Sequence, residues 1–172
     1  MKTIEENLRE FIFGVEDGLI GNLGVVIGLA TANAPNNLIL LAGLATMFAQ
    51  SISMSAGNYL SIKSEKEYFE VNKKDRKYGK KYAQKKQVLS STLVMASSVF
   101  IGAAIPVSTY LFFPSSQGII PSVALTLTAL FMVGVYKSSW TNRPWILSGG
   151  EMAIVGSIAA TAGYIIGAFL GV

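Results

Sequence analysis

The sequence contains no cysteine and no histidine among its 172 residues. Without cysteine the chain forms no disulfide bond, and without either residue it offers no zinc site of the Cys/His type. The absence of histidine also excludes acid–base catalysis by an imidazole and haem ligation by that side chain. A metal ion could therefore meet only carboxylate, amide, carbonyl or thioether groups. No motif of a soluble enzyme remains, and we predict that the protein is not an enzyme.

Charge is scarce as well, because only 14% of the residues are charged, against about 25% in an average soluble domain. Ten of the fourteen Lys and Arg residues lie between Lys63 and Lys86. This distribution excludes a soluble globular protein. The net charge of +4 comes from that one segment, so it bears on membrane orientation and not on binding to nucleic acid. The charged residues outside positions 1–10 and 63–87 are Glu16, Asp17, Lys137, Arg143 and Glu151.

Long apolar segments make up most of the rest of the chain. A membrane-spanning helix needs about 20 mostly apolar residues, and five segments meet that requirement. We therefore predict an all-α integral membrane protein, one domain over 1–172, with Pro106 kinking the third helix and Pro121 in the first turn of the fourth. The predicted helices cover about 11–33, 38–62, 88–112, 119–136 and 147–171, with a basic connector over 63–87.

The basic residues predict an orientation. Lys2 and Arg9 precede the first helix, and the connector 63–87 and the loop 137–146 fall on the same side if five helices alternate. The two opposite loops carry no charge. The positive-inside rule then places the N-terminus in the cytosol and the C-terminus outside. The acidic N-terminal segment is not typical of a signal peptide.

The first predicted helix carries two adjacent carboxylates, Glu16 and Asp17. An ionised carboxylate inside a membrane costs about 2.5–3.5 kcal/mol on insertion scales, so it usually faces a partner or a substrate path. Asp17, Gly21, Gly24 and Gly28 share one helix face, where another backbone could come close. Glu16 lies about 100° away on the helix. We therefore expect Asp17 to face the path and Glu16 to face a cavity edge or the lipid headgroups, and a path carboxylate can exchange a proton for a cation.

The second predicted helix has a stripe of small, polar and thioether side chains. This pattern is typical of ordinary helix packing. Beside an acidic first helix it also fits a cation path, because oxygen and sulfur ligands together suit Fe²⁺ or Mn²⁺ better than Ca²⁺ or Mg²⁺. The stripe contains Gly43, Met47, Gln50, Met54, either Gly57 or Asn58, and Ser61.

Two further acidic features allow two interpretations each. Glu151 follows Gly149 and Gly150, where it either favours the first turn of a helix or accepts ions at the cytosolic mouth. The fifth helix also has a stripe of glycine and alanine, which we interpret as a helix contact.

The connector is either a solvated extension that contacts anionic lipids or a metal-collecting segment. The carboxylates in question there are Glu65, Glu67, Glu70 and Asp75.

Four stretches of the chain are similar to the vacuolar iron transporter (VIT) family. They are GVEDGLIGNLGVVIGLA (14–30), LAGLATMFAQSISMSAGNYLSIKSE (41–65), VFIGAAIPVSTYLFF (99–113) and SGGEMAIVGSIAATAGYIIG (148–167). The resemblance implies a five-helix homodimer with an ion path along the dimer interface. It also implies export of Fe²⁺, often with Mn²⁺, from the cytosol in exchange for protons. The family's path acid matches Asp17 and its path methionine matches Met54.

The chain departs from that family at two places. Many relatives have glutamate where this chain has Asn58, and some have a long glutamate-rich insertion where this chain has the short basic connector. The resemblance therefore implies a short form without a cytosolic metal-binding domain.

We predict a proton-coupled exporter of Fe²⁺, with Mn²⁺ as a related cation, and the metal is its substrate and not a cofactor. A passive cation channel and a structural membrane protein are the alternatives. The expected partners are divalent cations, protons, the lipid bilayer and a second copy of the chain, and no nucleic acid. A prokaryotic cell membrane is favoured over a vacuolar one. The predicted metal ligands are Asp17 and Met54, followed by Gln50, Asn58, Glu16 and Glu151.

Overall fold

The protein is a bundle of long helices, seen in a computed structural model that describes residues 7–71 and 88–171 of the chain. Five of the helices in these ranges are long and apolar enough to cross a membrane, and the ranges contain no strand. The prediction of an all-α protein with five spans is thus confirmed. The helices are α2 (Leu8–Thr31), α3 (Asn36–Val71), α5 (Val88–Ser108), α6 (Ser115–Thr141) and α7 (Trp145–Leu170), and the 3₁₀ turn η2 (Thr109–Leu111) follows α5.

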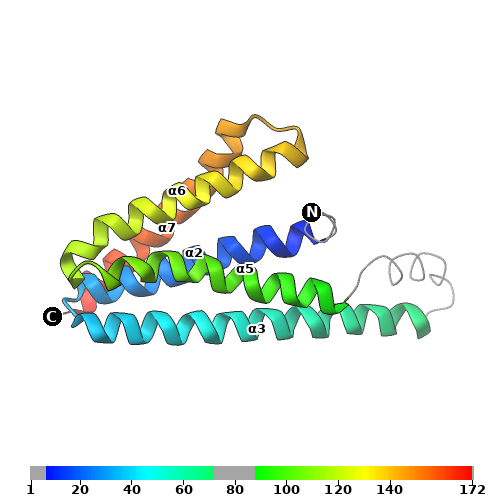
Figure 1. Ribbon diagram of the computed structural model, residues 1–172, viewed down its shortest axis with the longest axis horizontal. Helices are drawn as coiled ribbons and strands as arrows, with labels where there is room; N and C mark the ends of the chain where they lie inside the picture. Colours follow the sequence, from blue (N-terminus) through cyan, green and yellow to red (C-terminus); the bar gives the residue numbers. More distant parts are fainter. Residues whose placement is uncertain (1–6, 72–87, 172) are drawn as a thin grey trace.

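Helix α2 is the centre of the bundle, because it packs against all four other long helices. Its side chains Leu19, Leu23 and Val26 are completely buried. Helix α3 packs along α5, and α6 packs along α7. Figure 1 shows the α6–α7 pair diverging from α3 and α5 as the helices run away from the α5–α6 turn.

Glycines allow α2 to approach two of its neighbours closely. A methyl group on Gly18 would collide with the carbonyl oxygen of Val99 on α5. On α7, a methyl group on Gly163 would lie 2.6 Å from the carbonyl oxygen of Gly24, and one on Gly167 would meet that of Gly28. Close backbone approach of this kind is how membrane helices commonly associate. It confirms that the small-residue stripe of the fifth helix is a helix contact.

Pro106 lies inside α5, as predicted, and is buried. Its missing N–H leaves the preceding turn of the helix one hydrogen bond short. The side chain of Asn22 on α2 donates from Nδ2 to the carbonyl of Ala103 in that turn, at 3.0 Å, and to the carbonyl of Gly43 on α3, also at 3.0 Å. One buried amide therefore joins three helices beside the proline.

Several helix ends differ from the prediction. Helix α6 begins at Ser115, where the Gly118 amide donates to the Pro114 carbonyl at 2.8 Å. Pro121 is therefore inside the helix and not in its first turn. At its other end α6 ends at Thr141, and the left-handed conformation of the next residue, Asn142 (φ 52°), terminates it. The predicted loop 137–146 thus shrinks to the residues between α6 and α7.

Helix α3 is also longer than predicted and continues to Val71. The first part of the basic connector is therefore helical, as the i, i+4 pair of Lys63 and Glu67 favours (3.9 Å). The rest of the connector, including Asp75, lies outside the described residues.

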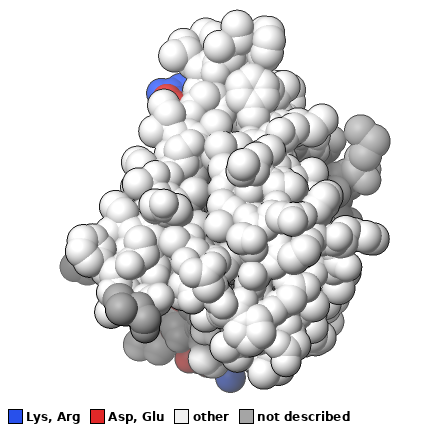
Figure 2. Space-filling view, turned by 90° about the vertical axis from the view of Figure 1, so that its left-hand side faces the viewer, with Lys and Arg blue, Asp and Glu red and all other residues white. Residues whose placement is uncertain are grey.

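One end of the bundle presents almost no charge. Figure 2 views the molecule from the end that carries the α2–α3 and α5–α6 turns, and only a few charged atoms appear at the edges of this face. The described residues between α2 and α3, and between η2 and α6, include no Lys, Arg, Asp or Glu. This asymmetry is the basis of the predicted orientation, which stays a prediction.

Candidate ion-binding site

Asp17 on α2 and Gln50 on α3 are in direct contact. The Gln50 side chain donates from Nε2 to Oδ2 of Asp17 at 3.0 Å, and its distance to the Asp17 backbone carbonyl is 3.4 Å. Both residues are half-buried. Both residues lie within predicted membrane spans. The contact therefore places an acid and an amide together inside the membrane-spanning part of the bundle.

Gly21 makes this contact possible. A methyl group at position 21 would collide with the carboxamide of Gln50. The chain therefore uses glycine here to let a side chain from α3 lie across α2 and reach Asp17, one helical turn away. The sequence pattern predicted a backbone contact along this face. The structure places backbone against Gly24 and Gly28, but a side chain against Gly21.

The Gln50 carboxamide also has an oxygen without a partner. Its Oε1 atom is buried and accepts no hydrogen bond from any described residue. A buried polar atom without a partner costs about 1–3 kcal/mol, and such atoms often mark a place for a ligand or an ion. The carboxylate of Asp17 and the amide oxygen of Gln50 are both oxygen donors of the kind that divalent cations accept. In the structure the Nε2 group of Gln50 faces Asp17, so a cation would be bound by both oxygens only after the carboxamide rotates.

Met54 and Asn58 extend the same line along α3. Met54 is four residues after Gln50, so the two side chains lie on one face about 5–6 Å apart at Cβ. Both Met54 and Asn58 line a cleft of about 260 Å³ between the beginning of α2 and α3, with Met95 of α5 at its edge. Asn58 donates from Nδ2 to the hydroxyl of Ser91 at 3.0 Å, which fixes its amide.

Two acids in the cleft were not predicted as site residues. Glu10 is buried, with 2% of its surface exposed, and Glu65 lines the cleft from the extended part of α3. Glu10 is seven residues before Asp17, so helical periodicity places both on one face of α2. That spacing could have identified Glu10. Glu65 was considered only as part of a connector, because hydropathy does not show that α3 continues past the membrane.

The remaining predicted residues lie apart from these two groups. Glu16 is half-buried and has no hydrogen bond to another described residue. Glu151 is exposed and forms an ion pair with Arg143, whose Nη1 lies 3.2 Å from its Oε1. The structure thus joins Asp17 with Gln50 and Met54 with Asn58, and it brings neither Glu16 nor Glu151 into either group.

No three Asp or Glu side chains within the described ranges cluster as ligands for one ion. A cation at Asp17 would consequently meet one carboxylate together with the Gln50 amide of the same chain. Such a mixed set holds an ion less tightly than a cage of carboxylates, because each neutral ligand contributes less charge. Loose binding suits an ion that must leave again.

Comparison with known proteins places these features in a family context. The profile of the VIT family matches residues 8–82 and 76–168. The chain is 29% identical to vacuolar iron transporter 1 of Tulipa gesneriana, over 94% of this chain and 86% of the tulip protein. It is 28% identical to vacuolar iron transporter 1 of Arabidopsis thaliana, over 94% of this chain and 85% of that protein. An uncharacterized protein of the archaeon Methanocaldococcus jannaschii is 29% identical over 90% of this chain and 85% of its own length.

Proposed function

The chain belongs to the VIT family, and we propose that it transports Fe²⁺, with Mn²⁺ as a related substrate, out of the cytosol in exchange for protons. The protein is a multi-pass membrane protein and not an enzyme. Relatives in plants are named vacuolar iron transporters, which supports iron as the substrate. The relative in an archaeon supports a prokaryotic cell membrane as the location.

The observation that carries this proposal is the contact between Asp17 and Gln50. It places a carboxylate and an unsatisfied amide oxygen together inside a membrane-spanning helix pair. An ion that enters the cleft passes Asn58 and Met54 first and then reaches this pair. Rotation of the Gln50 carboxamide brings Oε1 beside the Asp17 carboxylate, so that both oxygens and the nearby thioether bind the ion.

Asp17 also supports the exchange of a cation for a proton. A carboxylate in the membrane is costly when ionised and unpaired, so it favours either a bound cation or a bound proton. When the cation leaves on the far side, protonation removes the charge. When the site opens to the cytosol again, the proton is released there and the carboxylate binds the next cation.

A dimer would complete the site. One chain brings a single carboxylate, Asp17, into the contact with Gln50, and in a symmetric dimer the same surface of both chains meets itself. If α2 and α3 face the two-fold axis, a second Asp17 lies across the path. We therefore propose a homodimer with the ion path along the contact, as the family resemblance implied.

Transport by reconstituted protein tests the proposal. Purified protein in proteoliposomes receives Fe²⁺ under reducing conditions, or Mn²⁺, while interior metal and pH are recorded. We expect metal uptake with proton release, and loss of at least 90% of it in Asp17→Asn, which keeps the shape and removes the charge. Glu16→Gln removes the same charge one residue away and should lose far less.

Three outcomes would contradict the proposal in different ways. Metal flux without proton movement would indicate a passive channel. No flux under any gradient, with folded protein, would indicate a structural role. Normal transport by Asp17→Asn would exclude Asp17 as the path acid.

A further inference from the structure

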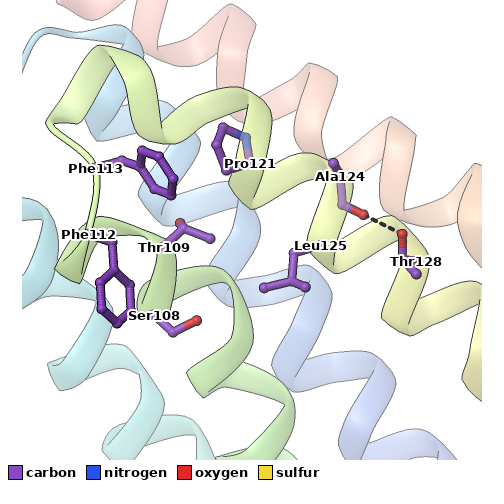
Figure 3. Close-up of a pocket in the computed structure, with 8 residues that line it drawn as sticks. All are labelled: Ser108, Thr109, Phe112, Phe113, Pro121, Ala124, Leu125 and Thr128. Carbon is purple, nitrogen blue, oxygen red and sulfur yellow. Dashed lines mark hydrogen bonds between the residues drawn. The ribbon is translucent and has the colours of Figure 1, made fainter.

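An apolar groove lies between the end of α5 and the first half of α6, away from the candidate ion site. Its volume is about 500 Å³, which falls in the range of about 300–1,000 Å³ for small-molecule sites. Figure 3 shows the aromatic rings and Pro121 around it, with Leu125 on the α6 side. The residues that line it are Ser108, Thr109, Phe112, Phe113, Pro121, Ala124, Leu125 and Thr128.

The hydroxyl groups in the groove are already engaged. Ser108 donates to the carbonyl of Ile105 at 2.7 Å, Thr109 to that of Pro106 at 2.9 Å, and Thr128 to that of Ala124 at 2.7 Å. These are bonds within each residue's own helix segment, and Figure 3 marks the last of them. None of the lining residues is charged. A ligand in the groove would therefore make apolar contacts, and the hydroxyl protons are already donated elsewhere.

The walls of the groove are also open to the surroundings. Phe112 is 80% exposed and Leu125 is 46% exposed. Both helices are long and apolar enough to cross a membrane, so the medium around them is hydrocarbon. The concave shape arises because α5 and α6 diverge from their shared turn, as Figure 1 shows. A flexible apolar chain that follows this divergence contacts two helices at once, whereas lipid on a convex helix contacts one.

The end of the groove indicates which headgroup would fit. Beside it, the beginning of α6 exposes Ser116 and Gln117, which offer neutral hydrogen-bonding groups. Figure 2 shows that this end of the molecule is almost free of charge. An anionic headgroup would find no cation among the described residues at this end, because ten of the fourteen basic residues of the chain fall at positions 63–86 of the sequence.

We propose that this groove binds one acyl chain of a phospholipid with a zwitterionic or uncharged headgroup, which lies near Ser116 and Gln117. The occupied groove joins α5 to α6 where the two helices separate. This site is independent of the proposed transport activity, because none of its residues belongs to the Asp17–Gln50 pair or to the cleft at Met54.

Photocrosslinking tests this proposal directly. The protein is reconstituted in phosphatidylcholine that contains a small fraction of phosphatidylcholine with a diazirine in its acyl chain, irradiated, digested and mapped by mass spectrometry. We expect adducts concentrated on Phe112, Phe113 and Leu125. Ala124→Trp fills the groove and should lower these adducts at least fivefold, and Leu125→Trp provides a second filled variant. Ala162→Trp, on an exposed face of α7, is the matched control and should leave them unchanged.

The competing outcomes are distinct. Adducts spread evenly over α6 and α7, or unchanged in both filled variants, would show ordinary surrounding lipid and overturn the proposal. Stronger labelling of the groove by an anionic diazirine lipid than by the phosphatidylcholine probe would overturn the assigned headgroup. Wild-type protein without adducts in the groove would show that no acyl chain lies there and would overturn the proposal.

Discussion

Gly18 and Gly21 lie three residues apart on α2, and their neighbours are of different kinds. Gly18 faces the backbone of α5, where the Val99 carbonyl leaves no space for a methyl group. Gly21 faces the end of the Gln50 side chain, which reaches past it to Asp17. Backbone cannot move aside without shifting a helix, whereas a carboxamide can rotate away. The same residue type therefore fixes the packing of α2 against α5 at Gly18 and makes room for the contact between Gln50 and Asp17 at Gly21.

Helix α2 therefore contacts its neighbours in two ways, through backbone on one part of its surface and through side chains on another. Its contacts with α5 and α7 are backbone contacts at Gly18, Gly24 and Gly28, which hold the helices at a set distance. Its contact with α3 at the level of Asp17 is made by side chains. An ion path needs groups that rearrange as the ion and the proton exchange, so the α3 side of the helix is the suitable place for it.

The largest effect is expected for Gly18→Ala. The added methyl group would collide with the Val99 carbonyl and lie 2.8 Å from the Ala103 amide nitrogen. Overpacking of this kind costs about 1–3 kcal/mol or more when backbone must move. We expect a clear fall in the yield of folded protein and in its melting temperature, measured by size-exclusion chromatography and thermal unfolding in detergent.

Gly150→Ala is the matched control, because nothing lies within 4 Å of the added methyl group. It should be as stable as the wild type. Equal stability of Gly18→Ala and Gly150→Ala would show that the close approach of the α5 backbone at Gly18 does not constrain the packing of α2.

A smaller loss of stability is expected for Asn22→Leu. The substitution keeps the approximate size and removes two hydrogen bonds, to Gly43 and Ala103, each at 3.0 Å. Interhelical hydrogen bonds in membranes contribute about 0.6 kcal/mol on average, so the two together amount to about 1 kcal/mol. The measurement is the melting temperature, with Ser97→Ala as control, since Ser97 bonds only within its own helix. An unchanged melting temperature would show that Asn22 does not join the three helices.

Gly21→Ala should affect transport more than stability. The methyl group would displace the Gln50 carboxamide from Asp17, and the end of a side chain can rotate without moving a helix. We expect a melting temperature within a few degrees of the wild type and a several-fold fall in metal uptake. In a Gln50→Ala background the same substitution should have no further effect, because the side chain that it displaces is gone. A large loss of stability in Gly21→Ala would show that this glycine, like Gly18, is needed for the packing of the helices.

Much of the fold was predictable from the sequence, but the contacts of the site were only partly so. Hydropathy identifies the five spans, and the scarcity of charge singles out Asp17. Periodicity assigns residues to helix faces but does not say which helix faces which. The pattern therefore marked Gln50 as a candidate, yet the structure was needed to place it against Asp17. The length of α3 was missed for a related reason, since its last turns are polar and hydropathy records only the apolar part.

The smallest effect is expected for Arg143→Gln, which removes the exposed ion pair with Glu151 across the turn between α6 and α7. Nη1 and Oε1 are 3.2 Å apart, and both side chains are more than half exposed, so the pair contributes about 0–1 kcal/mol. We expect unchanged metal uptake and a melting temperature within about four degrees of the wild type, by the size of that contribution. Glu151 is not in the first turn of α7, as one interpretation of the sequence had it. Glu151→Gln then tests the other interpretation, that it accepts ions, because the ion pair with Arg143 alone predicts the same small effect. If Glu151→Gln lowers uptake while Arg143→Gln does not, Glu151 accepts ions at the mouth of the path, and the ion-handling part of the molecule extends from α2 and α3 to α7.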